Sequence, residues 1–124
     1  MTIQADLRAR LTGLAGGRVY WDERPQNTAL PAIVISQPSD SRPQTLKDAD
    51  LPFPRFQVDV LTLSFAEKLS LKEAVIAALS SPAVQGGTQF MRATEVTART
   101  FNERTETQFI FRDAIDFVIP WTTA

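Results

Sequence analysis

The chain has no histidine and no cysteine among its 124 residues. These two side chains supply most of the nucleophiles, proton carriers and metal ligands that enzymes use near neutral pH. A serine or cysteine hydrolase of the usual kind needs an imidazole to activate its nucleophile, and this chain offers none. A zinc site would have to be built from carboxylates alone. We therefore expect a protein that is not an enzyme and that has no metal site.

Nucleotide-binding and membrane-spanning motifs are absent as well. The five glycines form neither GxGxxG nor GxxxxGK[ST], so we expect no nucleotide-binding loop and no cofactor. No apolar run approaches the roughly 20 residues of a membrane span, and the N-terminal MTIQADLRARL contains no apolar signal core. The formal net charge of −1 gives no field that would hold nucleic acid or an anionic membrane. These absences predict a soluble protein made in the cytoplasm.

The composition that is present is that of an ordinary globular domain. Hydrophobic residues make up 44% of the chain and charged residues 22%, which predicts a single domain over residues 1–124. Among the cations, ten arginines stand against three lysines. Arginine is enriched at protein interfaces and lysine is depleted there, but codon usage in a GC-rich genome produces the same bias. The sequence leaves both explanations open.

Apolar spacing predicts two helices. Over residues 2–14, Ile3, Leu7, Leu11 and Leu14 recur at helical spacing and form one apolar stripe. Ser64 followed by Glu67 is a capping box, which begins a second helix that ends near residues 80–82.

The second helix carries two apolar stripes. One consists of Leu71, Val75, Ala78 and Leu79, the other of Phe65, Leu69 and Ile76, and Lys68 and Lys72 lie between them. In one interpretation the first stripe faces a sheet and the second faces a neighbouring chain. In the other, a single wide apolar face is edged by two lysines whose ammonium groups reach water.

The remaining patterns predict strands and one long connection. Strands are expected at 18–21, 32–37, 55–63, 88–101 and 107–120, the last two joined by a polar turn at 102–106. Residues 38–54 contain four prolines and no clear period, and connections of this length are commonly functional arms or disordered segments. The order α-β-β-β-α-β-β predicts an α+β fold in which two helices pack on a mostly antiparallel sheet, with a long β-hairpin arm at 38–54.

Carboxylates are the remaining candidates for chemistry. Asp113 and Asp116 are three residues apart on a strand, so we expect them on opposite faces. A carboxylate-only hydrolase or a small-ligand-binding domain stays an alternative, and a deep polar pocket containing Asp59 and Asp113 would support it. The arginines of the last hairpin lie close to Glu95, Glu103 and Glu106, which favours a mixed solvated surface over a nucleic-acid site.

Aromatic residues supply candidate interface anchors. Tyr20 and Trp21 are expected at the core or its edge, with interface contact as the alternative. Trp121 follows Pro120 close to the C-terminus and is harder to bury within one small domain, so an interface contact is a candidate role.

Several short segments, in this order and spacing, carry a resemblance that covers nearly the whole chain. They are Arg18-Val19-Tyr20, Arg24-Pro25-Gln26, Leu30-Pro31-Ala32-Ile33-Val34, Phe56-Gln57-Val58-Asp59-Val60, the helix at 66–79 and a last strand closing on Trp121. With them the chain resembles the tail-completion or tail-terminator family of long-tailed bacteriophages, which also occurs in prophages and gene transfer agents.

The resemblance implies a structural virion protein made in the host bacterial cytoplasm. Members assemble as a ring, commonly a homo-hexamer, at the head-proximal end of the tail tube. There the ring stops tube polymerisation and presents a surface for the head connector, while DNA passes through without sequence-specific binding. The expected partners are copies of the chain, the tail tube protein and the head-connector protein. A head–tail adaptor or neck protein of similar fold is the nearest alternative.

The same resemblance makes the segment 38–54 an arm that contacts neighbouring subunits or the tube. The candidate interface residues are Arg42, Gln44, Leu46, Leu51, Phe53, Arg55, Lys68, Lys72 and Trp121. Lys68 and Lys72 depart from the smaller apolar residues expected at those helix positions, which leaves open how the helix packs.

Overall fold

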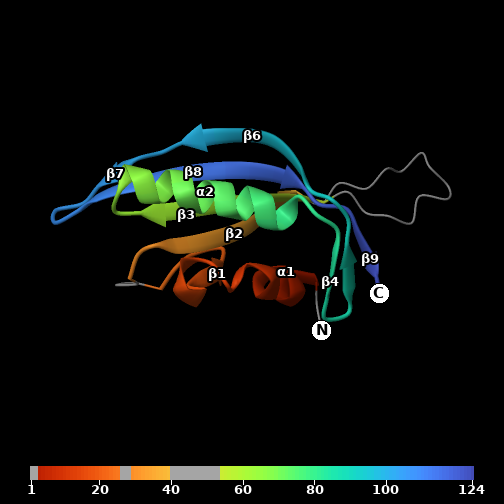
Figure 1. Cartoon of the computed structure of the whole chain (residues 1–124). Helices are drawn as coiled ribbons and strands as arrows, with labels where there is room; N and C mark the ends of the chain where they lie inside the picture. Colours follow the sequence, from red (N-terminus) through yellow and green to blue (C-terminus); the bar gives the residue numbers. More distant parts are fainter. Residues whose placement is uncertain (1–2, 26–28, 40–53) are drawn as a thin grey trace.

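The computed structural model describes residues 3–25, 29–39 and 54–124, which form two α-helices, one short 3₁₀ helix and nine strands (Figure 1). In chain order these are α1 (Ile3–Leu11), η1 (Ala15–Gly17), β1 (Val19–Trp21), β2 (Ala32–Ser39), β3 (Arg55–Thr62), α2 (Phe65–Leu79), β4 (Ala83–Gln85), β5 (Thr88–Phe90), β6 (Thr94–Thr100), β7 (Glu103–Arg104), β8 (Phe109–Val118) and β9 (Trp121–Thr123). Most of the predicted arm, residues 40–53, lies outside the described residues.

The main sheet has the strand order β1-β2-β3-β8-β6, and the short β7 pairs with β8. β1 runs parallel to β2, and every other pair in this sheet is antiparallel. β4, β5 and β9 form a separate three-stranded sheet. The predicted α+β class, mostly antiparallel sheet and element order are confirmed. The strand expected at 88–101 is divided between the two sheets, because β5 pairs with β4 and β9 whereas β6 pairs with β8.

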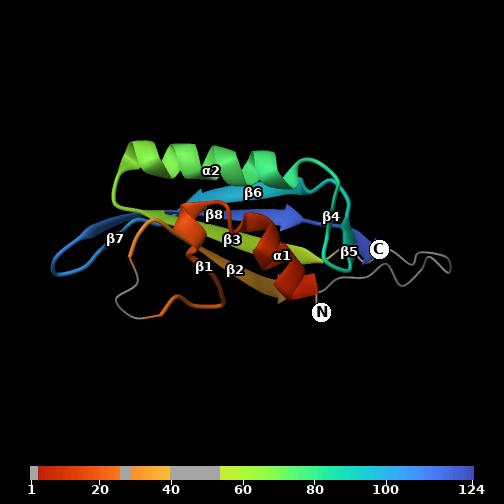
Figure 2. The same cartoon turned by 60° about the horizontal axis from the view of Figure 1, so that its bottom comes forward.

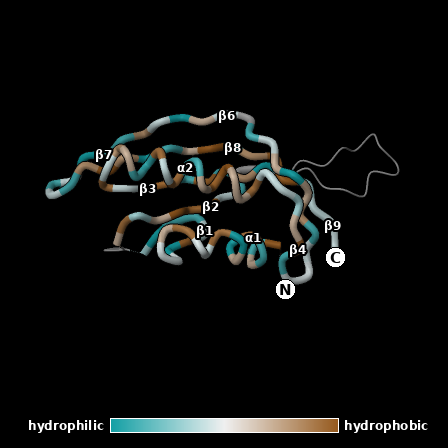
Figure 3. The backbone as a smooth tube through the Cα atoms, viewed as in Figure 1, coloured by the Kyte–Doolittle hydropathy of each residue, from teal (hydrophilic) through white to brown (hydrophobic). Residues whose placement is uncertain are grey.

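Both helices cover the same face of the main sheet, as the rotated view shows (Figure 2). The helical spacing that predicted α1 is confirmed, because Leu7 and Leu11 are fully buried against this face. β3 alternates as predicted, with Phe56, Val58 and Val60 turned toward the helices. The core between helices and sheet also contains Val19, Ile33, Ile35, Leu71, Val75, Leu79, Phe90, Ile115, Phe117 and Ile119. Apolar residues are dense along β2 and β8 in Figure 3.

The second helix begins where its capping box predicts. Ser64 has an extended backbone, and its Oγ accepts a hydrogen bond from the Glu67 N–H at 3.1 Å. The first predicted stripe faces the sheet, with Leu71, Val75 and Leu79 buried. Phe65 and Leu69 of the second stripe are 56% and 45% exposed, whereas Ile76 packs partly against the core. This helix therefore presents a short apolar strip, Phe65 and Leu69, to solvent in addition to the stripe that it buries.

Two side chains of helix α1, Arg10 and Asp6, form hydrogen bonds with distant parts of the chain. Arg10 Nη2 donates to the Ala78 carbonyl, in the last turn of α2, at 2.7 Å and to the Ser81 carbonyl just beyond the helix. These bonds place a cation at the C-terminal end of α2. Burial lowers the pKa of the Arg10 guanidinium below its ordinary value. On the next turn back, Asp6 Oδ2 accepts a 2.6 Å hydrogen bond from Thr88 Oγ1. These contacts join α1 to α2 and to the small sheet.

The turn between β4 and β5 passes directly over Asp6. Gly86 has φ +59°, and a Cβ placed there would lie 2.2 Å from Asp6 Oδ1. A larger residue at this position would both strain the backbone and collide with the buried carboxylate. Among the described residues, apart from its chain neighbours, no atom lies within 4 Å of a Cβ placed on Gly87.

The edge strand β6 differs from the rest of the sheet in its exposure. Every residue of β6 whose side chain is described is exposed, and its outer edge pairs with no strand within the described residues. Beyond β6, the turn between β7 and β8 falls at 105–108 rather than at the predicted 102–106. There the Thr105 N–H donates to the Gln108 carbonyl at 2.8 Å. In the described segments, neither helix has the length and apolarity needed to span a membrane.

Candidate functional site

The face of the main sheet opposite the helices carries a pocket of about 540 Å³. It is lined by Asp22, Glu23, Arg24, Pro25, Val34, Ser36, Gln57, Asp59, Leu61, Glu103 and Arg112. These residues come from β2, β3, β7, β8 and the segment after β1. We call this surface the open-face pocket.

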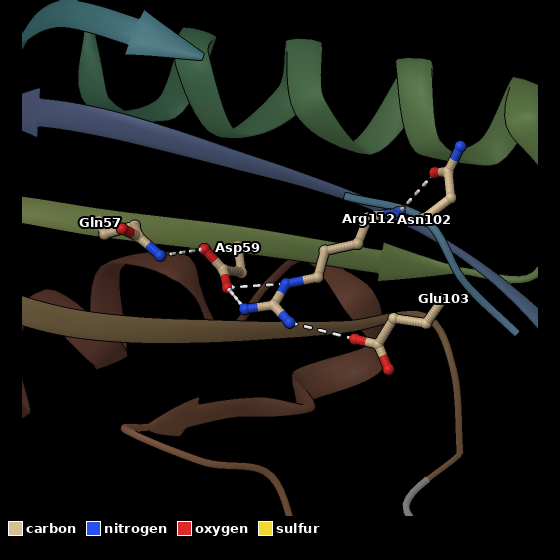
Figure 4. Close-up of polar contacts among 5 residues, drawn as sticks. All are labelled: Gln57, Asp59, Asn102, Glu103 and Arg112. Atoms are coloured by element: carbon tan, nitrogen blue, oxygen red, sulfur yellow. Dashed lines mark hydrogen bonds and ion pairs between the residues drawn. The ribbon is translucent and has the colours of Figure 1, made fainter. Parts of the chain in front are cut away.

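Arg112 is the centre of the polar contacts in the open-face pocket (Figure 4). Its Nε donates to Asp59 Oδ2 at 3.0 Å, its Nη2 donates to the same oxygen, and its Nη1 donates to Glu103 Oε1 at 3.1 Å. The other Asp59 oxygen accepts a 2.9 Å hydrogen bond from Gln57 Nε2. Arg112 lies opposite Leu61 in the β3–β8 register, so its diagonal neighbour on the same face is Asp59.

This network stabilises the charged form of Arg112. Burial would lower the pKa of Arg112, but the hydrogen bond and charge of Asp59, followed by those of Glu103, raise it above its ordinary value. Arg112 therefore stays protonated. Asp59 is only 4% exposed, and each of its two carboxylate oxygens accepts a hydrogen bond. A carboxylate held in this way is poorly suited to act as a general base. The arrangement suits a fixed, charged binding surface.

A second buried carboxylate, Asp113, lies on the helix-covered face. Lys68 Nζ is 3.2 Å from Asp113 Oδ1, Lys72 Nζ is 3.9 Å from Oδ2, and Thr100 Oγ1 donates to Oδ1 at 2.8 Å. The Lys68 side chain is only 5% exposed, and its ammonium lies 5.1 Å from the centre of the Phe65 ring. The expectation of two lysines reaching water at the helix edge is therefore wrong for Lys68, because Asp113 offers its ammonium a buried partner.

Asp59 and Asp113 do not share a pocket. In the β3–β8 register Asp59 lies opposite Ala114 and Asp113 lies opposite Val60, so their side chains leave the sheet on opposite faces. Asp113 and Asp116 also lie on opposite faces, as the sequence predicts. The observation that would have supported a carboxylate-only hydrolase, one pocket containing Asp59 and Asp113, is not met. Within the described ranges no group of three or more acidic residues is arranged to hold a metal ion.

Exposed aromatic residues gather where α2 begins and the β7–β8 hairpin ends. The ring of Phe111 contacts Phe65 and Phe109 edge-on, with centroids 6.3 and 4.9 Å apart. Arg104 lies over Phe109 at 5.3 Å and Arg99 lies over Phe101 at 5.2 Å. The sequence predicted a mixed solvated surface here. Glu103 does pair with Arg112, but Arg99 and Arg104 stack on aromatic rings instead of pairing with the nearby glutamates.

The structure places the predicted interface residues in different environments. Arg42, Gln44, Leu46, Leu51 and Phe53 lie outside the described residues. Arg55 is exposed at the start of β3, and Lys72 is 25% exposed beside Asp113. Trp121 begins β9 opposite Phe90 and packs partly against the core. Trp21 lies at the core edge, where its Nε1 donates to the Gln4 carbonyl at 3.1 Å.

Comparison with known proteins gives a matching family and solved structures of similar fold. The sequence profile of the family described as tail completion protein gp17 matches residues 2–112. No curated protein matches the sequence. A chain from the solved virion of a native gene transfer agent particle has a similar fold, with a TM-score of 0.58 and 21% sequence identity. The alignment covers 98% of this chain and 93% of that one.

Proposed function

The chain belongs to the tail completion protein gp17 family, a family of structural phage tail proteins, and from this premise we propose its place in the tail. The protein forms a ring, most simply a homo-hexamer, at the head-proximal end of a phage-type tail tube. The ring ends tube polymerisation and joins the tail to the head. Its partners are copies of itself, the tail tube protein and the head connector. It acts by assembly and not as an enzyme.

The observation that carries this proposal is the extent of the family match. Residues 2–112 include both helices and four of the five strands in the order of the main sheet, together with the start of the fifth, β8. The similar fold in a gene transfer agent virion is consistent with a role in a phage-type particle. The exposed apolar strip of α2 and the exposed aromatic residues of the hairpin supply surface for protein contacts.

The physical mechanism we propose is capping by surface mismatch. One face of the ring complements the last ring of tube subunits, while the other face lacks the surface that would recruit another. A head-to-tail contact that closes by rotation gives a ring and not a filament. The net charge of −1 suits a channel through which DNA slides, because stacked cationic rings would retain phosphate. An assembled lumen lined with unpaired arginines would contradict this last point.

Electron microscopy of particles made without this protein tests the proposal. Overlong, unterminated tails would support a tail terminator. Tails of normal length that fail to join heads would instead support the alternative, a head–tail adaptor or neck protein. Finished particles of normal appearance would overturn both assignments.

We propose in addition that the segment 38–54 contacts a neighbouring subunit or the tube, through Arg42, Gln44, Leu46, Leu51 and Phe53. Light scattering of the purified chain, with and without residues 40–53, tests this contact. If the intact chain forms a ring and the deletion variant does not, the arm is needed for assembly. An unchanged ring in the deletion variant would remove these residues from the interface.

A further inference from the structure

We propose that the β7–β8 hairpin of one copy docks, through Arg104 and Phe109, into the open-face pocket of a second copy. This inference rests on the proposed function and deepens it, because it assigns the contact between neighbouring subunits to two named surfaces.

The hairpin presents an arginine and an aromatic ring as one unit. Phe109 is 36% exposed, and Arg104 lies over its ring at 5.3 Å. Arg104 is itself exposed, and within the described part of the chain its guanidinium makes no ion pair. The contact with the ring favours this position of the guanidinium, and arginine and aromatic residues are enriched among the residues that dominate the energetics of interfaces. In Figures 1 and 2 the end of this hairpin projects beyond both helices.

The open-face pocket has the opposite charge. Its lining contains four carboxylates, Asp22, Glu23, Asp59 and Glu103, against two guanidinium groups, Arg24 and Arg112, which gives a formal charge of −2. Arg112 is occupied by Asp59 and Glu103. Asp22 and Glu23 are exposed at the rim, and neither makes an ion pair within the described residues.

The backbone that carries these rim carboxylates is anchored to the sheet. The Asp22 N–H donates to the Ile35 carbonyl at 2.8 Å, and the Glu23 N–H donates to the Trp21 carbonyl at the same distance. An anchored backbone leaves only side-chain freedom to be lost at the rim when a cation binds. The pocket volume of about 540 Å³ also lies within the range of sites that enclose side-chain-sized groups.

The hairpin cannot fill the pocket of its own chain. Glu103 points into the pocket, and the next residue, Arg104, lies opposite Phe109 on the other side of the hairpin. The two surfaces are therefore available only to different copies. In the proposed ring each copy offers its hairpin to one neighbour and its pocket to the other, which is the head-to-tail type of contact that closes into rings.

Site-directed cross-linking tests the contact cleanly because the chain has no cysteine of its own. We would prepare Glu23→Cys and Arg104→Cys as separate single-cysteine chains, mix them, oxidise them and separate the products on a non-reducing gel. The expected result is a disulfide-linked dimer that is at least about tenfold more abundant in the mixture than in either chain alone. Arg92→Cys, another exposed arginine, replaces Arg104→Cys in the matched control mixture.

The cross-linking is done both on the concentrated pure chain and on assembled tails. A cross-link in either sample supports the contact. A yield in both samples no higher than that of the Arg92→Cys control would overturn it. Efficient cross-linking of Glu23→Cys to itself would also overturn it, because the occupant of the pocket would then be different.

A charge exchange separates this inference from the proposed function. In particles that depend on this protein, we expect Glu23→Arg or Arg104→Glu alone to lower the yield of finished particles about tenfold or more. The double variant should restore much of the lost yield, whereas Arg92→Glu alone should give the same yield of finished particles as the native chain.

Tails that need the protein but show no rescue by the double variant would refute the docking and leave the proposed function standing. If tails are completed and joined to heads without the protein, the proposed function is refuted. The cross-linking experiment then still tests whether the hairpin docks into the pocket.

Discussion

The two faces of the main sheet each bury one aspartate, and they neutralise it in different ways. On the helix-covered face Asp113 meets two lysines and a threonine, whereas on the open face Asp59 meets an arginine and a glutamine. Both aspartate side chains are 5% exposed. Lysine acts as a point charge that fits beneath a helix, whereas the planar arginine fork bridges two carboxylates at the wall of a pocket. The burial of a carboxylate alone thus does not distinguish a structural ion pair from part of a binding surface.

The largest effect is expected beneath the helix. Lys68→Met removes the closest cation of Asp113 and leaves a buried carboxylate with Thr100 and a lysine 3.9 Å away. We expect the free energy of unfolding to fall by about 3–5 kcal/mol, as measured by urea denaturation. The double variant Lys68→Met with Asp113→Leu should recover most of the loss, because neither charge is then buried. A loss of about 2 kcal/mol or less would mean that this face is at least as tolerant as the open one.

A smaller effect is expected on the open face. Arg112→Ala leaves Asp59 without its cation, but the arginine side chain is 33% exposed and water can replace part of its contacts. We expect a loss of about 2 kcal/mol in the same denaturation experiment. Glu103→Gln, whose side chain is 42% exposed, is the matched control and should change stability by about 0.5 kcal/mol or less.

The pH dependence of that loss follows from the sign of the pKa shift. Because the pKa of Arg112 is raised in the folded chain, its stabilising contribution is fully present below the ordinary arginine pKa and is lost only above it. The difference between the native chain and Arg112→Ala should therefore stay constant from about pH 7 to pH 10. A difference that shrinks as the pH rises within this window would show that a group other than Arg112 is titrating.

The smallest effect on stability is expected at the solvent-facing stripe of α2. Leu69 is 45% exposed, so Leu69→Ser should change the free energy of unfolding by about 0.5 kcal/mol or less. If this stripe contacts a neighbouring chain, the same change should still lower the yield of finished particles. Unchanged stability together with unchanged assembly would assign the stripe to solvent. Leu71→Ser, on the buried stripe of the same helix, is the control in which folding itself should fail.

The parts of this fold that the sequence predicts are those set by local pattern. The stripe containing Leu7 and Leu11 and the cap formed by Ser64 and Glu67 depend on residues a few positions apart, and both are confirmed. The small sheet was not predicted, because three-residue strands carry too little pattern to reveal that β5 pairs with β9 near the end of the chain.

The candidate site was predictable only in fragments. Asp59 was singled out for a possible pocket, but its partner Arg112 lies 53 residues further along the chain and no local signal joins them. The burial of Lys68 was missed for the same reason, because its partner Asp113 belongs to another strand. The stacking of Arg104 on Phe109 depends on strand register, which the placement of the turn at 102–106 did not give.

The crossing of the β4–β5 turn over Asp6 has a consequence for mutational tolerance. Two adjacent glycines, 86 and 87, look equivalent in the sequence, yet only the first has a carboxylate against its α-carbon. In a saturation library selected for folded chains, position 86 should retain glycine almost exclusively, whereas position 87 should accept many side chains. Codon counts at these two neighbouring positions would thus report on how closely the first helix approaches the small sheet.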